Sequence, residues 1–216
     1  AAFTSYHHGE KSVVEAMVGL AQGDVGRNNV TYLVPSGQFG DRNFPSSNHA
    51  AERYIFTKLD PIAPFLFPKA DNAVLHFPSV DGEVHQPSYF APVICTALIN
   101  GSNGIAMGFS TTIPNYNPKD VLNATRIYLN QGEESLNNLK LVPWYDGFEG
   151  NITVEPDKII TEGKWTYDAN NGILRITELP VGTWTNNYYE YLKTKLVLGI
   201  EGCVSDAFLK DVPTNL

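Results

Sequence analysis

Three short clusters in this sequence have residue types and spacings that could do chemistry. A His-His-Gly-Glu run occupies residues 7–10, a Gly-Gln-Phe-Gly run occupies residues 37–40, and Arg53 directly precedes Tyr54. Paired histidines can serve in acid–base catalysis or bind a metal, but a metal site needs at least a third ligand. An Arg-Tyr dipeptide is commonplace in proteins. Taken one at a time, each cluster is better explained by packing or solvation than by catalysis.

The elements that must position these clusters can be predicted from periodicity and turn residues. Apolar residues at three- and four-residue spacing predict an amphipathic helix over residues 9–22. Residues 36–47 are rich in Gly, Ser, Asn and Pro and are predicted to form an exposed loop. Residues 50–59 are predicted to be a helix that carries Tyr54. The pair Asp60-Pro61 predicts the start of another short helix, because Asp suits an N-cap and Pro suits the first helical position.

Beyond this region the sequence predicts a mixture of hairpins and helices. Asp81-Gly82 predicts a tight hairpin within residues 73–84. An apolar run over 91–99 leads into a flexible loop at 100–104. Short β-branched and aromatic runs after Gly150 predict one twisted antiparallel sheet. Two further helices are predicted, over 118–130 and 187–198.

Composition is that of a folded, soluble chain with no membrane partner. Its 216 residues are 43% hydrophobic and 18% charged, without an apolar run long enough to cross a bilayer. The formal net charge of −8 argues against nucleic-acid binding when charge is averaged over the chain. Cys95 and Cys203 fit no metal-ligand spacing and are interpreted as buried thiols in a reducing compartment.

Five blocks in order give the sequence a strong resemblance to a known family. They are Ser-Tyr-His-His-Gly-Glu at 5–10, Gly-Gln-Phe-Gly at 37–40, Arg-Tyr-Ile-Phe-Thr at 53–57, Leu-Ile-Asn-Gly-Ser-Asn-Gly-Ile at 98–105 and Glu-Leu-Pro-Val-Gly-Thr-Trp-Thr at 178–185. Together they resemble the eukaryotic type of type IIA DNA topoisomerase, topoisomerase II. Bacterial gyrase and topoisomerase IV fit less well, because they carry a longer glycine-containing loop at the Gly-Gln-Phe-Gly position.

The resemblance implies an α+β fold with two domains and a DNA-cutting tyrosine. Residues 1–112 would form a winged-helix domain, and residues 113–216 would form an incomplete, sheet-rich tower domain. Tyr54 matches the nucleophile that forms a 5′-phosphotyrosyl bond. Arg53 matches the neighbouring arginine, whose guanidinium can stabilise charge on the phosphate oxygens. His8, and with less support His7, match histidines near the cleaved phosphate, where they could donate to the phosphate or help take the tyrosine proton.

The resemblance also implies contacts with double-stranded DNA outside the cleavage site. Ile105 matches an apolar side chain that wedges between base pairs and bends the duplex, although without its flanking motif it would be interpreted as a turn residue. Gln38, Lys11 and Arg42 are the other candidate DNA contacts. Ser47 stands where the family commonly has lysine, and Gly182 replaces a common arginine. These departures indicate a divergent, viral or protist member.

Other functions of the family are expected to depend on parts outside this sequence. The family's Mg²⁺ ligands lie in a Toprim domain and its ATP site lies in an ATPase domain, and neither motif occurs here, so this segment alone is expected to be inactive. One tyrosine per strand implies a homodimer. The expected location is the nucleus for a cellular eukaryote, or the host compartment of replication for a virus. The competing interpretation is a winged-helix DNA-binding or scaffold module that does not cleave.

Overall fold

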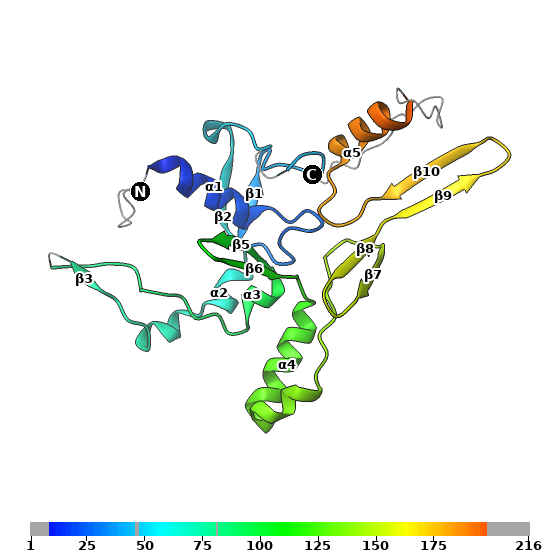
Figure 1. Cartoon of the computed structure of the whole chain (residues 1–216). Helices are drawn as coiled ribbons and strands as arrows, with labels where there is room; N and C mark the ends of the chain where they lie inside the picture. Colours follow the sequence, from blue (N-terminus) through cyan, green and yellow to red (C-terminus); the bar gives the residue numbers. More distant parts are fainter. Residues whose placement is uncertain (1–8, 46–47, 81, 198–216) are drawn as a thin grey trace.

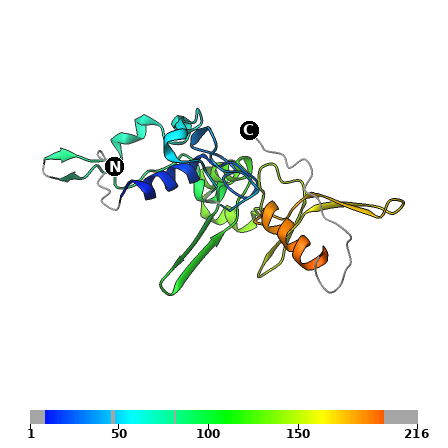
Figure 2. The ribbon, with the colours of Figure 1, turned by 90° about the horizontal axis from the view of Figure 1, so that it is seen from above.

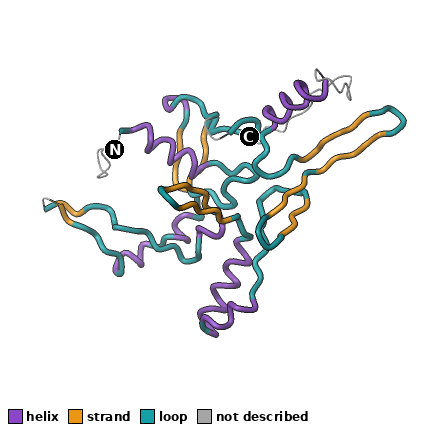
Figure 3. The backbone as a smooth tube through the Cα atoms, in the orientation of Figure 1, coloured by secondary structure: helices purple, strands orange, loops and turns teal. Residues whose placement is uncertain are grey.

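The protein is built from small hairpins and helices that extend from a common centre. The computed structural model describes residues 9–45, 48–80 and 82–197. Within these ranges the strands form five antiparallel pairs, each a separate two-stranded sheet, and helices lie between them. Figures 1 and 2 show several arms that radiate from the centre, and Figure 3 shows how much of the path is loop. The predicted α+β class is confirmed.

The helices are short, with two exceptions. The α-helices are α1 (Glu10–Ala21), α2 (Ala63–Leu66), α3 (Thr96–Ile99), α4 (Pro118–Gln131) and α5 (Thr185–Tyr191). The remaining helical turns are the 3₁₀ segments η1 (Glu52–Tyr54), η2 (Lys69–Ala73) and η3 (Glu133–Asn138), and the π-helix η4 (Leu192–Val197). No helix in the described part of the chain is long and apolar enough to cross a membrane.

The two long helices form where the sequence predicted them, because their residues suit a helix of that length. Helix α1 buries Val18 and Ala21, three residues apart, on one face. Helix α4 begins with Pro118, and the side chain of Asn117 caps it by accepting a hydrogen bond from the Lys119 amide at 2.9 Å. It ends at Gly132, whose φ of 81° stops the helix. Both predictions are confirmed.

Each described strand pairs only with a strand that is next to it in the sequence. The pairs are β1 (Leu33–Ser36) with β2 (Phe56–Leu59), β3 (Ser79–Val80) with β4 (Glu83–Val84), β5 (Ser102–Ala106) with β6 (Phe109–Ile113), β7 (Asn151–Val154) with β8 (Ile159–Glu162), and β9 (Lys164–Asp168) with β10 (Ile173–Glu178). The predicted hairpin within residues 73–84 is confirmed. The single sheet predicted after Gly150 is wrong, since β7–β8 and β9–β10 are separate hairpins.

The helix predicted over residues 50–59 is also wrong. Only Glu52–Tyr54 are helical, as one 3₁₀ turn, and Phe56–Leu59 form strand β2. Strand β2 pairs in register with β1, so that Ser36 lies opposite Phe56. The aromatic and β-branched residues Phe56 and Thr57 favour a strand, and pairing with β1 overrides the helical pattern. Tyr54 therefore ends a short turn at the start of a strand.

Three smaller predictions need correction. The loop predicted at 100–104 lies largely in strand β5, because Ser102–Ala106 pair with β6. The helix predicted over 187–198 begins earlier, at Thr185, and changes to a π-helix at Leu192. Cys95 is exposed and not buried, because the apolar run that contains it is mostly loop and buries only Ile99 of the short α3. Cys203 lies outside the described residues.

One half-buried asparagine side chain joins four distant segments at the centre. The two N–H hydrogens of the Asn29 side-chain amide are shared among three carbonyls, those of Ile99 at 3.0 Å, Tyr116 at 3.1 Å and Trp144 at 3.0 Å. Its side-chain oxygen accepts one from the Asp146 amide at 2.9 Å. Backbone groups at the end of α3, before α4 and in the loop before β7 thereby find partners that no sheet provides.

Two neighbouring asparagines add further bonds to the same region. The Asn100 side chain accepts from the Val30 amide at 2.9 Å and donates to the Val30 carbonyl at 2.8 Å. Asn115, only 6% exposed, donates to the carbonyl of Arg27. The 27–30 segment is therefore the point to which the later half of the chain attaches.

Replacing Asn29 with Ala should destabilise the protein markedly. The change removes the two donor hydrogens and the acceptor oxygen of the amide and leaves partly buried carbonyls without donors, which should lower the free energy of unfolding by about 3 kcal/mol. Urea unfolding followed by tryptophan fluorescence measures this loss. Asn123→Ala, at an exposed position on α4, is the matched control and should have little effect. Equal stability of the two variants would contradict the central role of Asn29.

Candidate active site

A small group of apolar side chains brings the Gly-Gln-Phe-Gly run and the segment around Tyr54 together against α1. Phe39, Val18 and Ala21 are buried, with exposures of 6%, 3% and 1%. Partly buried side chains pack around them, namely Val14, Leu33 and Ile55. Phe39 belongs to the Gly-Gln-Phe-Gly run and Ile55 directly follows Tyr54. The same cluster therefore holds the Gly-Gln-Phe-Gly turn and the tyrosine segment side by side.

The backbones of these two segments are in direct contact at Gly37. Gly37 has a φ of 101°, and a Cβ built on it would lie 3.0 Å from the Tyr54 carbonyl oxygen and 3.2 Å from Cγ2 of Ile55. The Ala50 amide also donates to the Gln38 carbonyl at 2.9 Å. Glycine is needed at position 37 for two reasons, its left-handed backbone and the close approach of the tyrosine segment.

Tyr54 is presented to solvent beside a positive charge. Its side chain is 62% exposed, and the guanidinium carbon of Arg53 lies 4.8 Å from the centre of its ring. The Tyr54 amide donates to the Ala51 carbonyl at 2.9 Å, which closes the 3₁₀ turn. This cation–π contact keeps an exposed arginine next to the phenol. The Arg53 charge therefore lies against the ring that carries the phenol oxygen.

Gln38 and its neighbours are fixed by local hydrogen bonds. The Gln38 side-chain oxygen accepts from the Gly40 amide at 3.1 Å, and the side chain is exposed. Gln22, which is 5% exposed, donates from its side chain to the Phe39 carbonyl at 2.5 Å. Gln38 thus lies on the turn beside the tyrosine segment, with its side chain accessible to a ligand.

Arg42 is engaged with the segment that follows β10. Its guanidinium forms an ion pair with Glu178 at 2.5 Å and donates to the Leu179 carbonyl at 2.5 Å. Its own carbonyl accepts from the Thr185 amide at 3.2 Å. The Arg42 side chain is 21% exposed. These contacts give Arg42 a structural partner, and any DNA contact made by it would use the remaining exposed edge of the guanidinium.

Ile105 and Lys11 lie on other elements. Ile105 is 91% exposed on β5, and the β5–β6 hairpin projects clear of the body in Figure 2. Met107 and Phe109, at the tip of the hairpin, are 98% and 80% exposed. Lys11 is exposed in the first turn of α1, where it lies 3.8 Å from Glu15. His7 and His8 lie outside the described residues.

Metal donors are not gathered anywhere in the described part of the chain. No group of three or more His, Cys, Asp or Glu side chains there could hold a metal ion. His49 is half-buried, with its Nδ1 2.8 Å from the Ala50 carbonyl oxygen. The groups that the described residues bring to the site are therefore a phenol, a guanidinium and backbone groups.

The sequence comparison identifies the family. The family model described as the A subunit of DNA gyrase/topoisomerase IV matches residues 1–205. The chain belongs to this family. DNA topoisomerase 2 of Arabidopsis thaliana is 41% identical over 198 residues, covering 88% of this chain and 13% of that protein. The mitochondrial DNA topoisomerase 2 of Dictyostelium discoideum is 44% identical over 189 residues, covering 88% of this chain and 14% of that protein.

A solved structure agrees with this family membership. It is the crystal structure of the DNA-binding, cleavage and re-ligation domain of Plasmodium falciparum topoisomerase II, with a TM-score of 0.84 and 37% identity. The match covers 94% of this chain and 27% of the solved chain. The expected resemblance to the eukaryotic type of topoisomerase II is confirmed. The chain spans only a small part of the length of each relative.

Sequence reasoning missed the residues that connect the parts of the site. The sequence shows Glu178 and Trp184 only as members of a family block, and Arg27 only as one positive charge among others. Their contacts cross well over one hundred positions of sequence, as Arg42 with Glu178 shows. The signal available was indirect, because Arg42, which closely follows the family block at 37–40, contacts the family block at 178–185.

Replacing Gly37 with Ala should displace the tyrosine segment. Both Gly37 and Gly172 have positive φ, 101° and 66°, but a Cβ at Gly172 meets nothing within 4 Å. Each alanine should cost about 1 kcal/mol for its left-handed backbone, and only Gly37→Ala adds the clash with Tyr54. The difference in unfolding free energy between the two variants measures that clash. Equal losses would show that the contact at Gly37 does not restrain Tyr54.

Proposed function

We propose that this chain is the DNA-cutting part of an ATP-dependent type II topoisomerase and that Tyr54 is its nucleophile. The observation that carries the proposal is the exposed Tyr54 phenol with the Arg53 guanidinium 4.8 Å from its ring, on a turn held by the Phe39 cluster. The arrangement suits attack on an anionic diester, because the side chain that carries the reacting oxygen is exposed and a cation lies against its ring.

The proposed reaction exchanges one phosphate ester for another. The Tyr54 phenol oxygen attacks a backbone phosphorus atom, forming a bond to the 5′-phosphate as the bond from phosphorus to the 3′-oxygen breaks. The phenol proton passes to a base, for which His8 is the candidate and His7 the alternative. Arg53 stabilises the negative charge that grows on the non-bridging oxygens. The departing 3′-oxygen takes up a proton from water and becomes a 3′-hydroxyl. Because an ester bond is conserved in the intermediate, this hydroxyl can attack the phosphorus in the reverse reaction, releasing the Tyr54 phenol and resealing the strand.

The DNA contacts proposed around this centre come from separate elements. Gln38 lies on the turn beside the tyrosine segment, Lys11 is exposed on α1, and Arg42 lies on the loop that follows Gly40. Ile105 projects on the β5–β6 hairpin, whose residues 102–113 include no charged side chain. An uncharged apolar tip is suited to enter the base stack and bend the duplex, the trade that architectural DNA proteins make.

The proposal assigns the remaining parts of the reaction to other regions of the enzyme. We infer that a Toprim domain holds Mg²⁺, that an ATPase domain binds ATP, and that two copies act together with one tyrosine per strand. The donor groups of the described residues do not fit a Mg²⁺ site. Within this chain we propose a winged-helix domain over 1–112 and part of a tower domain over 113–216.

The cellular location follows the source of the enzyme. For a cellular eukaryote we propose the nucleus, and for a virus the host compartment in which its DNA replicates. One relative carries the word mitochondrial in its name, so an organelle is the alternative that localisation of the tagged full-length protein would reveal.

Tyr54→Phe should abolish covalent attachment to DNA. The full-length enzyme would be incubated with Mg²⁺ and internally labelled supercoiled DNA and quenched with detergent, and protein linked to the newly formed 5′ ends would be measured. Loss of the hydroxyl removes the nucleophile, so the adduct should vanish while DNA binding remains. Tyr167→Phe is the matched control, since Tyr167 on β9 is 60% exposed, and it should form adduct normally. DNA binding by the wild type without any adduct would favour a non-cleaving scaffold.

Ile105→Ala should reduce DNA bending. Truncation removes the side chain proposed to unstack one base step, so fluorescence energy transfer between the ends of a short bound duplex should approach that of a straight duplex. Leu129→Ala is the control, because Leu129 on α4 is an aliphatic side chain with 74% exposure. If both variants bend DNA like the wild type, Ile105 is not the wedge.

A further inference from the structure

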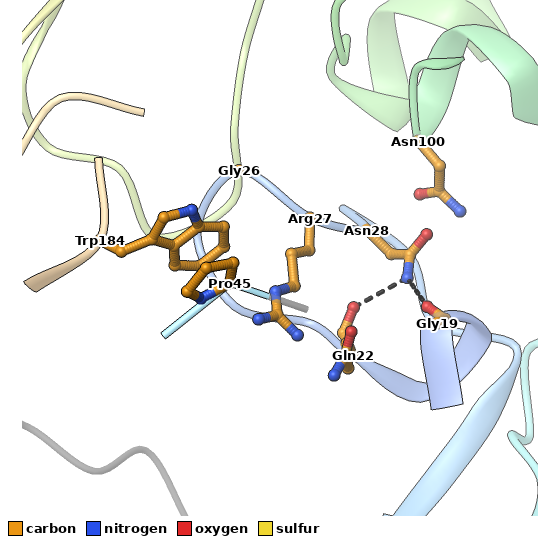
Figure 4. A pocket seen from close by; sticks show the side chains of 8 residues that line it. All are labelled: Gly19, Gln22, Gly26, Arg27, Asn28, Pro45, Asn100 and Trp184. Atoms are coloured by element: carbon orange, nitrogen blue, oxygen red, sulfur yellow. Dashed lines mark hydrogen bonds between the residues drawn. The ribbon is translucent and has the colours of Figure 1, made fainter. Parts of the chain in front are cut away.

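Arg27 is clamped between an aromatic ring and the loop that precedes Tyr54. Its guanidinium carbon lies 5.0 Å from the centre of the Trp184 ring. Its Nη2 donates to the carbonyls of Asp41 at 3.4 Å and Phe44 at 3.2 Å. Figure 4 shows Arg27 beside Trp184 and Pro45 at a cavity of about 320 Å³. The Arg27 side chain thus contacts both the loop that precedes Tyr54 and the segment that contains Trp184.

The electrostatics of Arg27 do not suit a purely stabilising role. Its side chain is 10% exposed, and its Nη1 lies 3.7 Å from the Asp24 carboxylate. Burial lowers the pKa of Arg27, and burial raises the pKa of Asp24 even though Arg27 opposes that rise. The Arg27 Nε and Nη1 atoms are buried without a hydrogen-bond partner. A buried pair with unmet donors gains little net stability, whereas it does define one arrangement of the groups around it.

The backbones on the two sides of this clamp approach closely. Gly26 has a φ of 85°, and a Cβ built on it would lie 2.8 Å from Cγ1 of Val181. The Thr185 and Asn186 amides donate to the carbonyls of Arg42 and Asn43 at 3.2 and 3.1 Å. Residues 178–186, called the strap from here on, therefore lie along the loop that begins at Asp41.

Separate hydrogen bonds hold several points of the chain between Asp41 and Tyr54. The Asp41 carboxylate accepts from the Asn48 side chain at 3.4 Å. The Ala50 amide donates to the Gln38 carbonyl at 2.9 Å, and the Tyr54 amide donates to the Ala51 carbonyl at 2.9 Å. Any shift of the Asp41 end of the loop would change the position from which the 3₁₀ turn presents the phenol.

We propose that Arg27 and Trp184 are positioning residues, which together with the strap fix the loop that sets the attack geometry of Tyr54. The inference rests on the proposed function of Tyr54. It adds the requirement that the loop before Tyr54 be held in place. Neither residue touches the reacting atoms. Their loss should slow attack by the phenol while leaving DNA affinity in place, because a small misplacement of a reacting group is costly to the rate.

The test measures single-turnover adduct formation by the full-length enzyme with saturating DNA and Mg²⁺. Trp184→Leu removes the aromatic face and should slow adduct formation by about ten- to a hundredfold, with an unchanged dissociation constant for DNA. Trp184→Phe keeps a π face and should restore most of the rate. Trp165→Leu is the matched control, since Trp165 is 67% exposed on β9, and its rate should equal the wild type.

A second variant keeps the test decisive if Trp184→Leu does not fold. Arg27→Lys retains the charge but loses the planar group that stacks and donates to two carbonyls, so it should also slow adduct formation. Arg175→Lys, at an exposed position on β10, is its control.

The outcomes separate this inference from the proposed function. Wild-type enzyme that forms no adduct would overturn the proposed function itself. Wild-type adduct together with normal rates in Trp184→Leu and Arg27→Lys would overturn only the positioning role. A slower rate explained entirely by weaker DNA binding, or shared by Trp165→Leu, would overturn it as well.

Discussion

The structure depends on how a loop-rich chain satisfies its backbone groups near the 27–30 segment. The five strand pairs are separate, so no extended sheet among the described residues provides partners for the loops between them. The Asn29 side chain does so for four residues at 2.9–3.1 Å, and Asn100 adds two further bonds to Val30. Few of the described side chains are fully buried. Hydrogen bonds therefore hold these segments together to a greater extent than apolar packing does.

The 27–30 segment also joins the central contacts to the candidate active site. Arg27, immediately before two asparagines, reaches the loop at Asp41 and Phe44, while its own carbonyl accepts from Asn115. The small apolar cluster around Phe39 then sets the tyrosine segment against α1. The exposed phenol is therefore supported from two directions, by apolar packing under its turn and by the strap along its loop. This support is what a reaction limited by geometry requires.

Some elements of the fold followed from local sequence signals, whereas the candidate site did not. Helix α4 was predictable because Asn117, Pro118 and Gly132 mark its ends, and the β3–β4 hairpin because of Asp81-Gly82. Tyr54 and Arg53 were found by family resemblance and not by spacing. The helix predicted over 50–59 failed because strand pairing with β1, more than twenty residues earlier, decides that segment.

Contacts between distant segments could not be predicted from the local sequence, for a physical reason. Asn29 in an Asn-Asn pair has the signature of a turn, and nothing nearby in sequence indicates that its amide serves residues 99, 116 and 144. Likewise Arg42 was expected to contact DNA, a prediction that stays open, while its partner Glu178 lies 136 positions away. Which distant groups pair with such amides and charges is determined by the topology, because the topology brings the segments together.

Direct identification of the residue joined to DNA tests the account most simply. The full-length enzyme would be trapped on DNA with Mg²⁺, digested with nuclease and trypsin, and its peptides analysed by mass spectrometry. The account predicts a 5′-linked nucleotide on Tyr54, in the peptide that begins after Arg53 or spans it. A nucleotide on any other residue, with the Tyr54 peptide unmodified, would contradict it.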